Sequence, residues 1–147
     1  WEDTKGRPFV GKAGKVLDEL LASISLRRED IYIANILKCR PLNNRDPLQS
    51  EIVACTPYLD KQIEVLNPKI IATLGNFALS YIFEKNKLKP ERVGKIHGNT
   101  FQVSNLRGIT KIIPLYHPAA ATYNPEMKKI MMEDFKSIRN ALHENNK

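Results

Sequence analysis

The sequence predicts a single α/β domain of three layers, in which a short central parallel sheet lies between two layers of helices. Short apolar segments rich in β-branched residues alternate along the chain with amphipathic segments, the pattern of buried strands and covering helices. Hydrophobic residues make up 42% of the 147 residues, which is enough for one core and excludes a mainly disordered chain. No apolar run approaches the ~18 residues of a membrane span.

The first half of the chain predicts a helix, a strand and a second helix. Apolar residues recur three and four positions apart from Lys12 to Ser25, which indicates a helix with one buried face. The segment Ile31–Leu37 is apolar on both faces and predicts a buried strand. A proline-containing loop over residues 38–49 follows, and Ser50 begins a helix that Asn67-Pro68 ends.

The second half predicts two more strands and two more helices. Lys69–Gly75 is the next buried strand, and a short helix follows from Asn76 to Phe83. Weak alternation over residues 94–103 indicates a hairpin near an edge of the sheet. Lys111–Tyr116 predicts the last strand, although its proline removes one ladder donor. An amphipathic helix is expected over residues 125–142.

Charge and cysteine content narrow the class of protein. A net charge of +7, from 23 Lys and Arg against 16 Asp and Glu, favours a partner with phosphates. Two cysteines are too few for a disulfide-stapled secreted module, which indicates an intracellular protein. The chain begins at Trp1 rather than Met, so we expect residues 1–147 to be one domain whose N-terminal part is absent.

Two polar residues follow predicted strands, at the edge where ligands bind in sheets of this kind. Asn35 lies at the far end of the first strand and His117 just past the last. The amide of Asn35 can pair with the edge of a nucleobase, and a neutral His117 can donate a hydrogen bond to charge developing on a leaving group. The alternatives are a loop-facing cap for Asn35 and a core imidazole for His117.

A glycine-flanked loop precedes the first helix. Phe9 lies between Gly6 and Gly11, and the loop lacks the Gly-Lys-Ser/Thr ending of a P-loop, which argues against nucleoside triphosphate hydrolysis. A rigidly held Phe9 is typical of a stacking platform for a planar ring, and a core aromatic is the alternative.

The cysteines and the basic residues around them leave two interpretations open. Cys39 and Cys55 are either unrelated small hydrophobic residues or two thiolate ligands of a metal site. Lys38, Arg40 and Arg45 are either a solvated surface or a basic rim that contacts phosphates.

Three motifs in order resemble the family 4 uracil-DNA glycosylases, the iron–sulfur type of bacteria and archaea. They are residues 2–14, Glu-Asp-Thr-Lys-Gly-Arg-Pro-Phe-Val-Gly-Lys-Ala-Gly; residues 35–41, Asn-Ile-Leu-Lys-Cys-Arg-Pro, continued by Asn-Arg-Asp-Pro at 44–47; and residues 117–120, His-Pro-Ala-Ala. Cys55 is also in register, and the resemblance covers essentially the whole chain. It implies the uracil-DNA glycosylase fold and hydrolysis of the N-glycosidic bond of uracil in DNA, leaving an abasic site.

The resemblance implies a role for each site residue. Phe9 would stack on the flipped uracil and Asn35 would bind its edge. Glu2 would lie against C5, where the methyl group of thymine would clash. His117 would stabilise the charge on the uracil O2, and Pro118, Ala119, Ala120 and Ala121 would press into the minor groove. Near Ala121 the family has a bulkier apolar residue.

The resemblance also implies a cofactor and partners. Cys39 and Cys55 match two of the four ligands of a 4Fe–4S cluster, and Arg40 would contact the DNA. The family's Gly-Glu-Ala-Pro-Gly turn, its first strand and the other two cysteines should precede Trp1, so we expect this fragment to be inactive alone. The implied enzyme is a monofunctional, monomeric glycosylase of the bacterial or archaeal cytoplasm with no membrane contact. A sliding clamp as partner is left open.

A second class of function remains at this point. A non-catalytic basic DNA-binding α/β domain with a thiolate metal site would share the charge and the cysteines. It leaves the coincidence of Glu2, Phe9, Asn35 and His117 unexplained.

Overall fold

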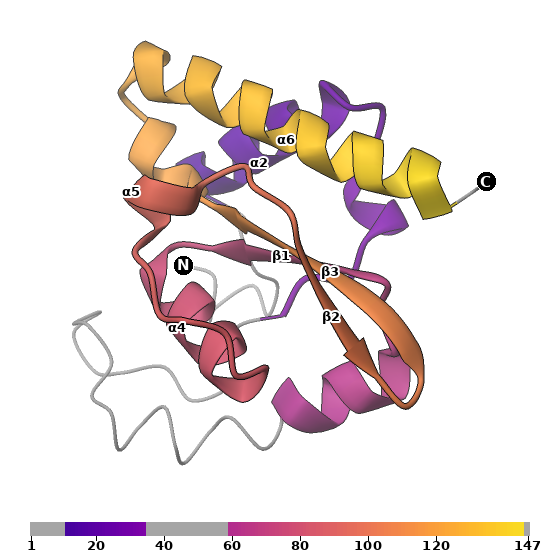
Figure 1. Ribbon diagram of the computed structural model, residues 1–147. Coiled ribbons are helices and arrows are strands. Elements are labelled where there is room, and N and C mark those ends of the chain that lie inside the picture. Colours follow the sequence, from indigo (N-terminus) through magenta and orange to yellow (C-terminus); the bar gives the residue numbers. More distant parts are fainter. Residues whose placement is uncertain (1–10, 35–58, 146–147) are drawn as a thin grey trace.

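The computed structural model describes residues 11–34 and 59–145, which contain a three-stranded sheet (Figure 1). The strands are β1 (Ile70–Leu74), β2 (Phe101–Asn105) and β3 (Gly108–Leu115), in the order β1-β3-β2. β1 runs parallel to β3, whereas β2 and β3 form an antiparallel hairpin. The predicted strands over 69–75 and 111–116 are therefore confirmed. The hairpin predicted over residues 94–103 occurs farther along the chain, over 101–115.

The proline of the central strand costs no ladder hydrogen bond. Lys111 donates its N–H to Lys69 in the direction of β1, and Leu115 accepts from Gly75 on the same side. The backbone nitrogen of Pro114 therefore points to the side of β2. The pairing of β2 starts at Phe101↔Ile112, so β2 does not extend as far as Pro114. Its carbonyl accepts the N–H of Gly98 at 2.8 Å. A strand position beyond the end of its neighbour accommodates proline because no donor is required there.

Helices cover both faces of the sheet, as a three-layer architecture requires. α2 (Lys12–Ala22) and α6 (Pro125–Asn145) lie on one side, and α4 (Asn76–Lys85) lies on the other with the short α5 (Val93–Ile96) (Figure 1). Two separate core clusters fill the two spaces. The cluster on the α2 and α6 side includes Ile113 and Leu115, and the cluster on the α4 side includes Ile112. Alternate residues of β3 thus supply both cores.

The described residues differ from the predicted elements in local detail. Residues 31–34 form no strand: Ile31 and Ile33 are partly buried against the first core cluster and Ile31 has an extended backbone, but no neighbouring strand pairs with them in the described residues. Residues 35–37 of that predicted strand lie outside the described part. α5 was not predicted. Asn76 does not cap α4, since its Oδ1 instead accepts the N–H of Val93 at 2.8 Å, at the start of α5.

The remaining helical segments agree with the predicted order. Residues 59–66 are helical, as expected for the end of the second helix, and two single turns, η1 (Arg28–Asp30) and η3 (Pro118–Ala121), complete the described part. None of the helices in residues 11–34 and 59–145 has both the length and the apolar character needed to cross a membrane.

Asp60 joins the helical residues 59–66 to α4. Its carboxylate accepts hydrogen bonds from Lys85 Nζ, at 2.7 Å, and from the Tyr81 hydroxyl. Burial raises the pKa of Asp60, but the hydrogen bonds and charge of Lys85 and the hydrogen bond of Tyr81 outweigh it, so the pKa lies below its ordinary value of 3.8. The ionised carboxylate therefore stabilises the fold above pH 3.8, and this contribution is lost as the pH falls through the lowered pKa.

Asp60→Asn is expected to lower the free energy of unfolding at pH 7 by about 0.2–1 kcal/mol, the range for a partly exposed pair. The difference from the wild type should be smaller at pH 3, because the contribution is lost as the pH falls from 3.8 through the lowered pKa. Urea unfolding at both pH values measures it. Glu126→Gln is the matched control, because Glu126 and Lys129 form a wide, exposed pair at 4.0 Å within one helix. A stability loss in Asp60→Asn that is the same at pH 7 and pH 3 contradicts the assignment.

Candidate active site

The carboxyl ends of β1 and β3 meet at one edge of the sheet. Leu74 and Leu115 are paired in register, and the N–H of Gly75 donates to the carbonyl of Leu115 at 2.9 Å. Tyr116 and His117 follow β3 at this edge, and α4 begins there after β1. In open α/β sheets this edge is where ligands bind, so His117 occupies the position that the sequence predicted for chemistry.

Local hydrogen bonding fixes the tautomer of His117. The residue is the N-cap of η3, and its Nδ1 accepts the backbone N–H of Ala119 at 3.1 Å. A backbone N–H can only donate, so Nδ1 carries no proton and the neutral ring bears its N–H on Nε2. Pro118 supports this geometry because a residue before proline is restricted to extended backbone, and His117 has φ −67° and ψ 136°. The exposed imidazole is therefore prepared to act as a hydrogen-bond donor through Nε2.

Gly75 allows the two strand ends to approach each other at His117. Its φ is +88°, a conformation that favours glycine. A Cβ built on Gly75 would lie 3.4 Å from the Cβ of His117 and 3.9 Å from its Cδ2. Any larger side chain at position 75 would compete with the imidazole for space.

The segment after His117 divides its side chains between the core and the surface. Pro118 and Ala121 are buried, Ala121 being 4% exposed in the core cluster on the α2 and α6 side. Ala119 and Ala120 are exposed. Of the four residues predicted to press into DNA, these two alanines alone present their side chains to solvent, because η3 packs its other face against α2 and α6.

An exposed tyrosine that sequence reasoning missed lies beside this segment. Tyr123 is 79% exposed, and Lys12, the first residue of α2, donates from Nζ to its hydroxyl and lies 4.7 Å from the ring centre. The contact joins the end of the predicted glycine-flanked loop to the histidine segment, 111 positions away. The only signal in the sequence is an aromatic residue in the polar turn Thr-Tyr-Asn-Pro.

A partly buried pair, His97 with Asp134, lies next to the end of β3. Nδ1 of His97 lies 2.7 Å from Oδ2 of Asp134 on α6, and the His97 ring lies 4.8 Å from that of Tyr116. Burial raises the pKa of Asp134, and the hydrogen bond and charge of His97 oppose that rise. The pair therefore links α6, the α5–β2 connection and the residue that precedes His117.

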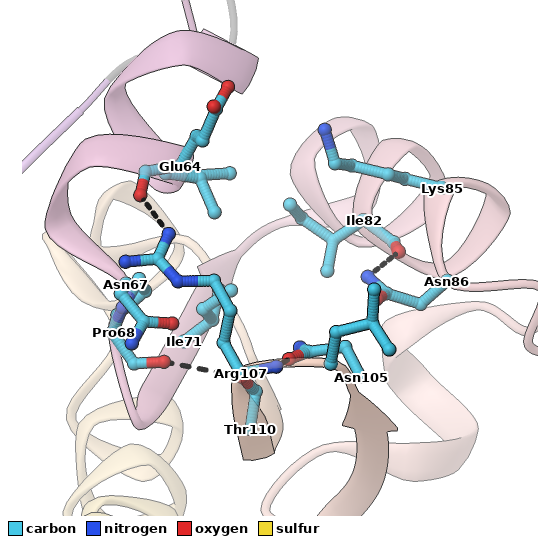
Figure 2. A pocket seen from close by; sticks show the side chains of 12 residues that line it. Glu64, Asn67, Pro68, Ile71, Ile82, Lys85, Asn86, Asn105, Arg107 and Thr110 are labelled. Atoms are coloured by element: carbon cyan, nitrogen blue, oxygen red, sulfur yellow. Dashed lines mark hydrogen bonds between the residues drawn. The ribbon is translucent and has the colours of Figure 1, made fainter.

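A hollow of about 390 Å³ lies near Pro68 and Thr110, at the end of β1 and β3 opposite to the carboxyl edge that carries His117. Figure 2 shows the side chains that line it. Pro68, before β1, and the turn of the β2–β3 hairpin help to line it. Figure 2 shows that two of its polar side chains bond to backbone carbonyls: Arg107 donates to the carbonyl of Glu64, and Asn86 donates to that of Ile82. This hollow lies between secondary-structure elements, and none of the predicted site residues lines it.

The other predicted site residues are Glu2, Phe9, Asn35, Arg40, Cys39 and Cys55, and all six lie outside the described residues. Their convergence with His117 on one pocket therefore stays a prediction. Within residues 11–34 and 59–145 no three His, Cys, Asp or Glu side chains are grouped to hold a metal ion.

Comparison with known proteins relates the chain to one family model and to several curated relatives. The family model described as "Uracil DNA glycosylase superfamily" matches residues 1–142. The type-4 uracil-DNA glycosylase of Saccharolobus solfataricus is 50% identical over 143 residues, which are 96% of this chain and 66% of that protein. Those of Archaeoglobus fulgidus and Thermotoga maritima are 47% and 42% identical, over 93% and 94% of this chain and 69% and 70% of their own lengths. The chain thus spans about two thirds of these curated relatives.

Proposed function

Because the chain belongs to the uracil-DNA glycosylase superfamily, among its type-4 members, we propose that the protein removes uracil from DNA. The reaction is hydrolysis of the bond between C1′ of deoxyribose and N1 of uracil, which leaves an abasic site. The observation that carries the proposal is His117 at the carboxyl edge of the sheet, with Nδ1 accepting the N–H of Ala119 and the proton on Nε2.

His117 acts on the leaving group. As the glycosidic bond breaks, its electron pair stays with uracil and positive charge develops on the sugar. The Nε2–H of His117 donates a hydrogen bond to the O2 of the departing uracil anion. Water adds to C1′ and its released proton neutralises the anion. Such a donor is effective because it is oriented before charge develops, here by the N-cap contact and by Pro118.

The remaining residues bind the extruded nucleotide. Phe9 stacks on the uracil ring, Asn35 pairs with its edge and distinguishes it from cytosine, and Glu2 excludes the methyl group of thymine. Arg40 and the exposed Ala119 and Ala120 form part of the protein surface that contacts DNA. Extrusion costs a few kcal/mol of stacking, least for a mispaired base, so excision from a U:G pair exceeds that from U:A.

Cys39 and Cys55 supply two thiolate ligands of an iron–sulfur cluster. Thiolates are the ligands that such clusters take, and a 4Fe–4S cluster takes four, so these two residues form half of a set. The cluster contributes no bond to the glycosidic chemistry in this proposal. The protein acts as a monomer on DNA in the bacterial or archaeal cytoplasm.

The test uses the full-length protein that contains this chain. Oligonucleotides with one uracil opposite guanine, opposite adenine or in a single strand are incubated with it, and abasic sites are revealed by alkali. We expect uracil release from all three and no strand break without alkali. Binding without release would leave only a non-catalytic DNA-binding domain. Iron and acid-labile sulfide, rather than zinc, are expected on metal analysis.

A further inference from the structure

Residues 118–121, which follow His117, present no large side chain to solvent. When a nucleotide leaves a duplex, the gap in the base stack is commonly filled by a protein side chain that intercalates. In residues 118–121 the outward side chains are the two methyl groups of Ala119 and Ala120, and Ala121 is committed to the core. These groups are too small to replace a base.

Tyr123 is a large exposed side chain placed directly after this segment. Its backbone lies in a turn that is held on both sides, since Thr122 donates to the carbonyl of Ala119 and Asn124 donates to that of Ala121. The side chain of Asn124 then accepts the N–H of Met127 at 3.1 Å and begins α6. A ring that is 79% exposed is thus carried by a fixed backbone between two helices.

Lys12 holds this ring by its hydroxyl end and brings positive charge to it. The ammonium group bonds the tyrosine hydroxyl, so the contact is made at the edge of the ring. Lys15, one turn along α2, is also exposed. A large ring that can insert between base pairs and adjacent cations that can contact phosphates are the two components needed to hold an opened duplex.

We propose that Tyr123 enters the DNA base stack beside the extruded nucleotide, and that Lys12 orients the ring and contacts a flanking phosphate. The inference rests on the proposed function, because the extruded nucleotide is the uracil of that reaction. Tyr123 takes no part in bond breaking. It stabilises the opened duplex, so its effect belongs to duplex substrates and not to single strands.

The first experiment compares single-turnover excision by the full-length wild type, Tyr123→Ala and Tyr123→Phe. For Tyr123→Ala we expect excision from U:A duplexes to fall by about 10-fold or more, and excision from single strands to change by less than about 2-fold. Tyr123→Phe should keep most of the duplex rate. Leu106→Ala is the control, since Leu106 is fully exposed at the opposite edge of the sheet. Equal rates on the duplex, or equal losses on both substrates, overturn the proposal.

The second experiment measures binding without catalysis. A duplex with a tetrahydrofuran abasic site flanked by 2-aminopurine reports stacking through its fluorescence. We expect Tyr123→Ala to bind about 10-fold more weakly without the wild-type fluorescence change. Lys12→Met should reduce the slope of log affinity against log salt by about one. If the wild type releases no uracil, the proposed function fails, and the role of Tyr123 is then decided by binding: it fails if Tyr123→Ala binds this duplex like the wild type.

Discussion

Replacing His117 by alanine in the full-length protein is expected to slow uracil release by about 10²–10³-fold, the usual loss when one oriented donor to a developing anion is removed. DNA affinity should stay near that of the wild type, because the interaction with O2 forms as the bond breaks. Single-turnover excision from a U:G duplex and binding to an abasic-site duplex measure the two quantities separately.

The N-cap position of His117 calls for a second variant. Alanine also removes the acceptor for the N–H of Ala119, which costs stability in its own right. His117→Asn keeps a side-chain acceptor of the kind that caps helices well, so its melting temperature should stay near that of the wild type. We expect uracil release by His117→Asn to be slowed as well. A wild-type rate in His117→Ala would contradict the role in leaving-group stabilisation.

The two strands that pair in parallel were predictable, because their apolar composition is typical of buried strands. Ile70–Leu74 and Gly108–Leu115 contain short apolar runs rich in β-branched residues, a pattern that favours a strand covered on both faces. Residues 31–34 carry a similar apolar pattern but form no ladder in the described structure. An apolar pattern favours packing against the core, as Ile31 and Ile33 do, but a strand additionally requires a neighbouring backbone with which to pair.

The site was predictable where local geometry decides it. A histidine before proline at a strand end has restricted backbone, and the structure places His117 accordingly. The burial of Ala121 was not predictable, because it depends on how η3 packs against α2 and α6. The contact of Lys12 with Tyr123 was missed for the same reason, since it joins segments 111 positions apart that only the fold brings together.

Gly98 lies where the fold leaves no room for a side chain. Its φ is +79°, and a Cβ built there would lie 3.0 Å from Cγ of Asp134 and closer still to Oδ1. The backbone is fixed on both sides, because Gly98 donates to Pro114 and accepts from the hydroxyl of Ser137. A shift of Gly98 would break its hydrogen bond to Pro114 in β3, and a shift of Asp134 would break its pair with His97.

Gly98→Ala is therefore expected to lower the free energy of unfolding by about 2 kcal/mol or more, from the left-handed backbone and from the overpacking together. Gly108→Ala is the matched control, because Gly108 has φ +122° but nothing within 4 Å of a built Cβ, so only the backbone cost applies. Guanidinium unfolding of the full-length proteins measures both variants.

A double-mutant cycle identifies the cause of the loss at Gly98. If the clash with Asp134 is the cause, Gly98→Ala should cost about 1 kcal/mol less in an Asp134→Ala background than in the wild type, a coupling typical of side chains in contact. Gly108→Ala should cost the same in both backgrounds, because nothing lies near its built Cβ. Equal costs for the two glycine variants in the wild type would contradict a clash with Asp134 as the cause of the stability loss. An additive cycle for Gly98 and Asp134 would contradict it as well.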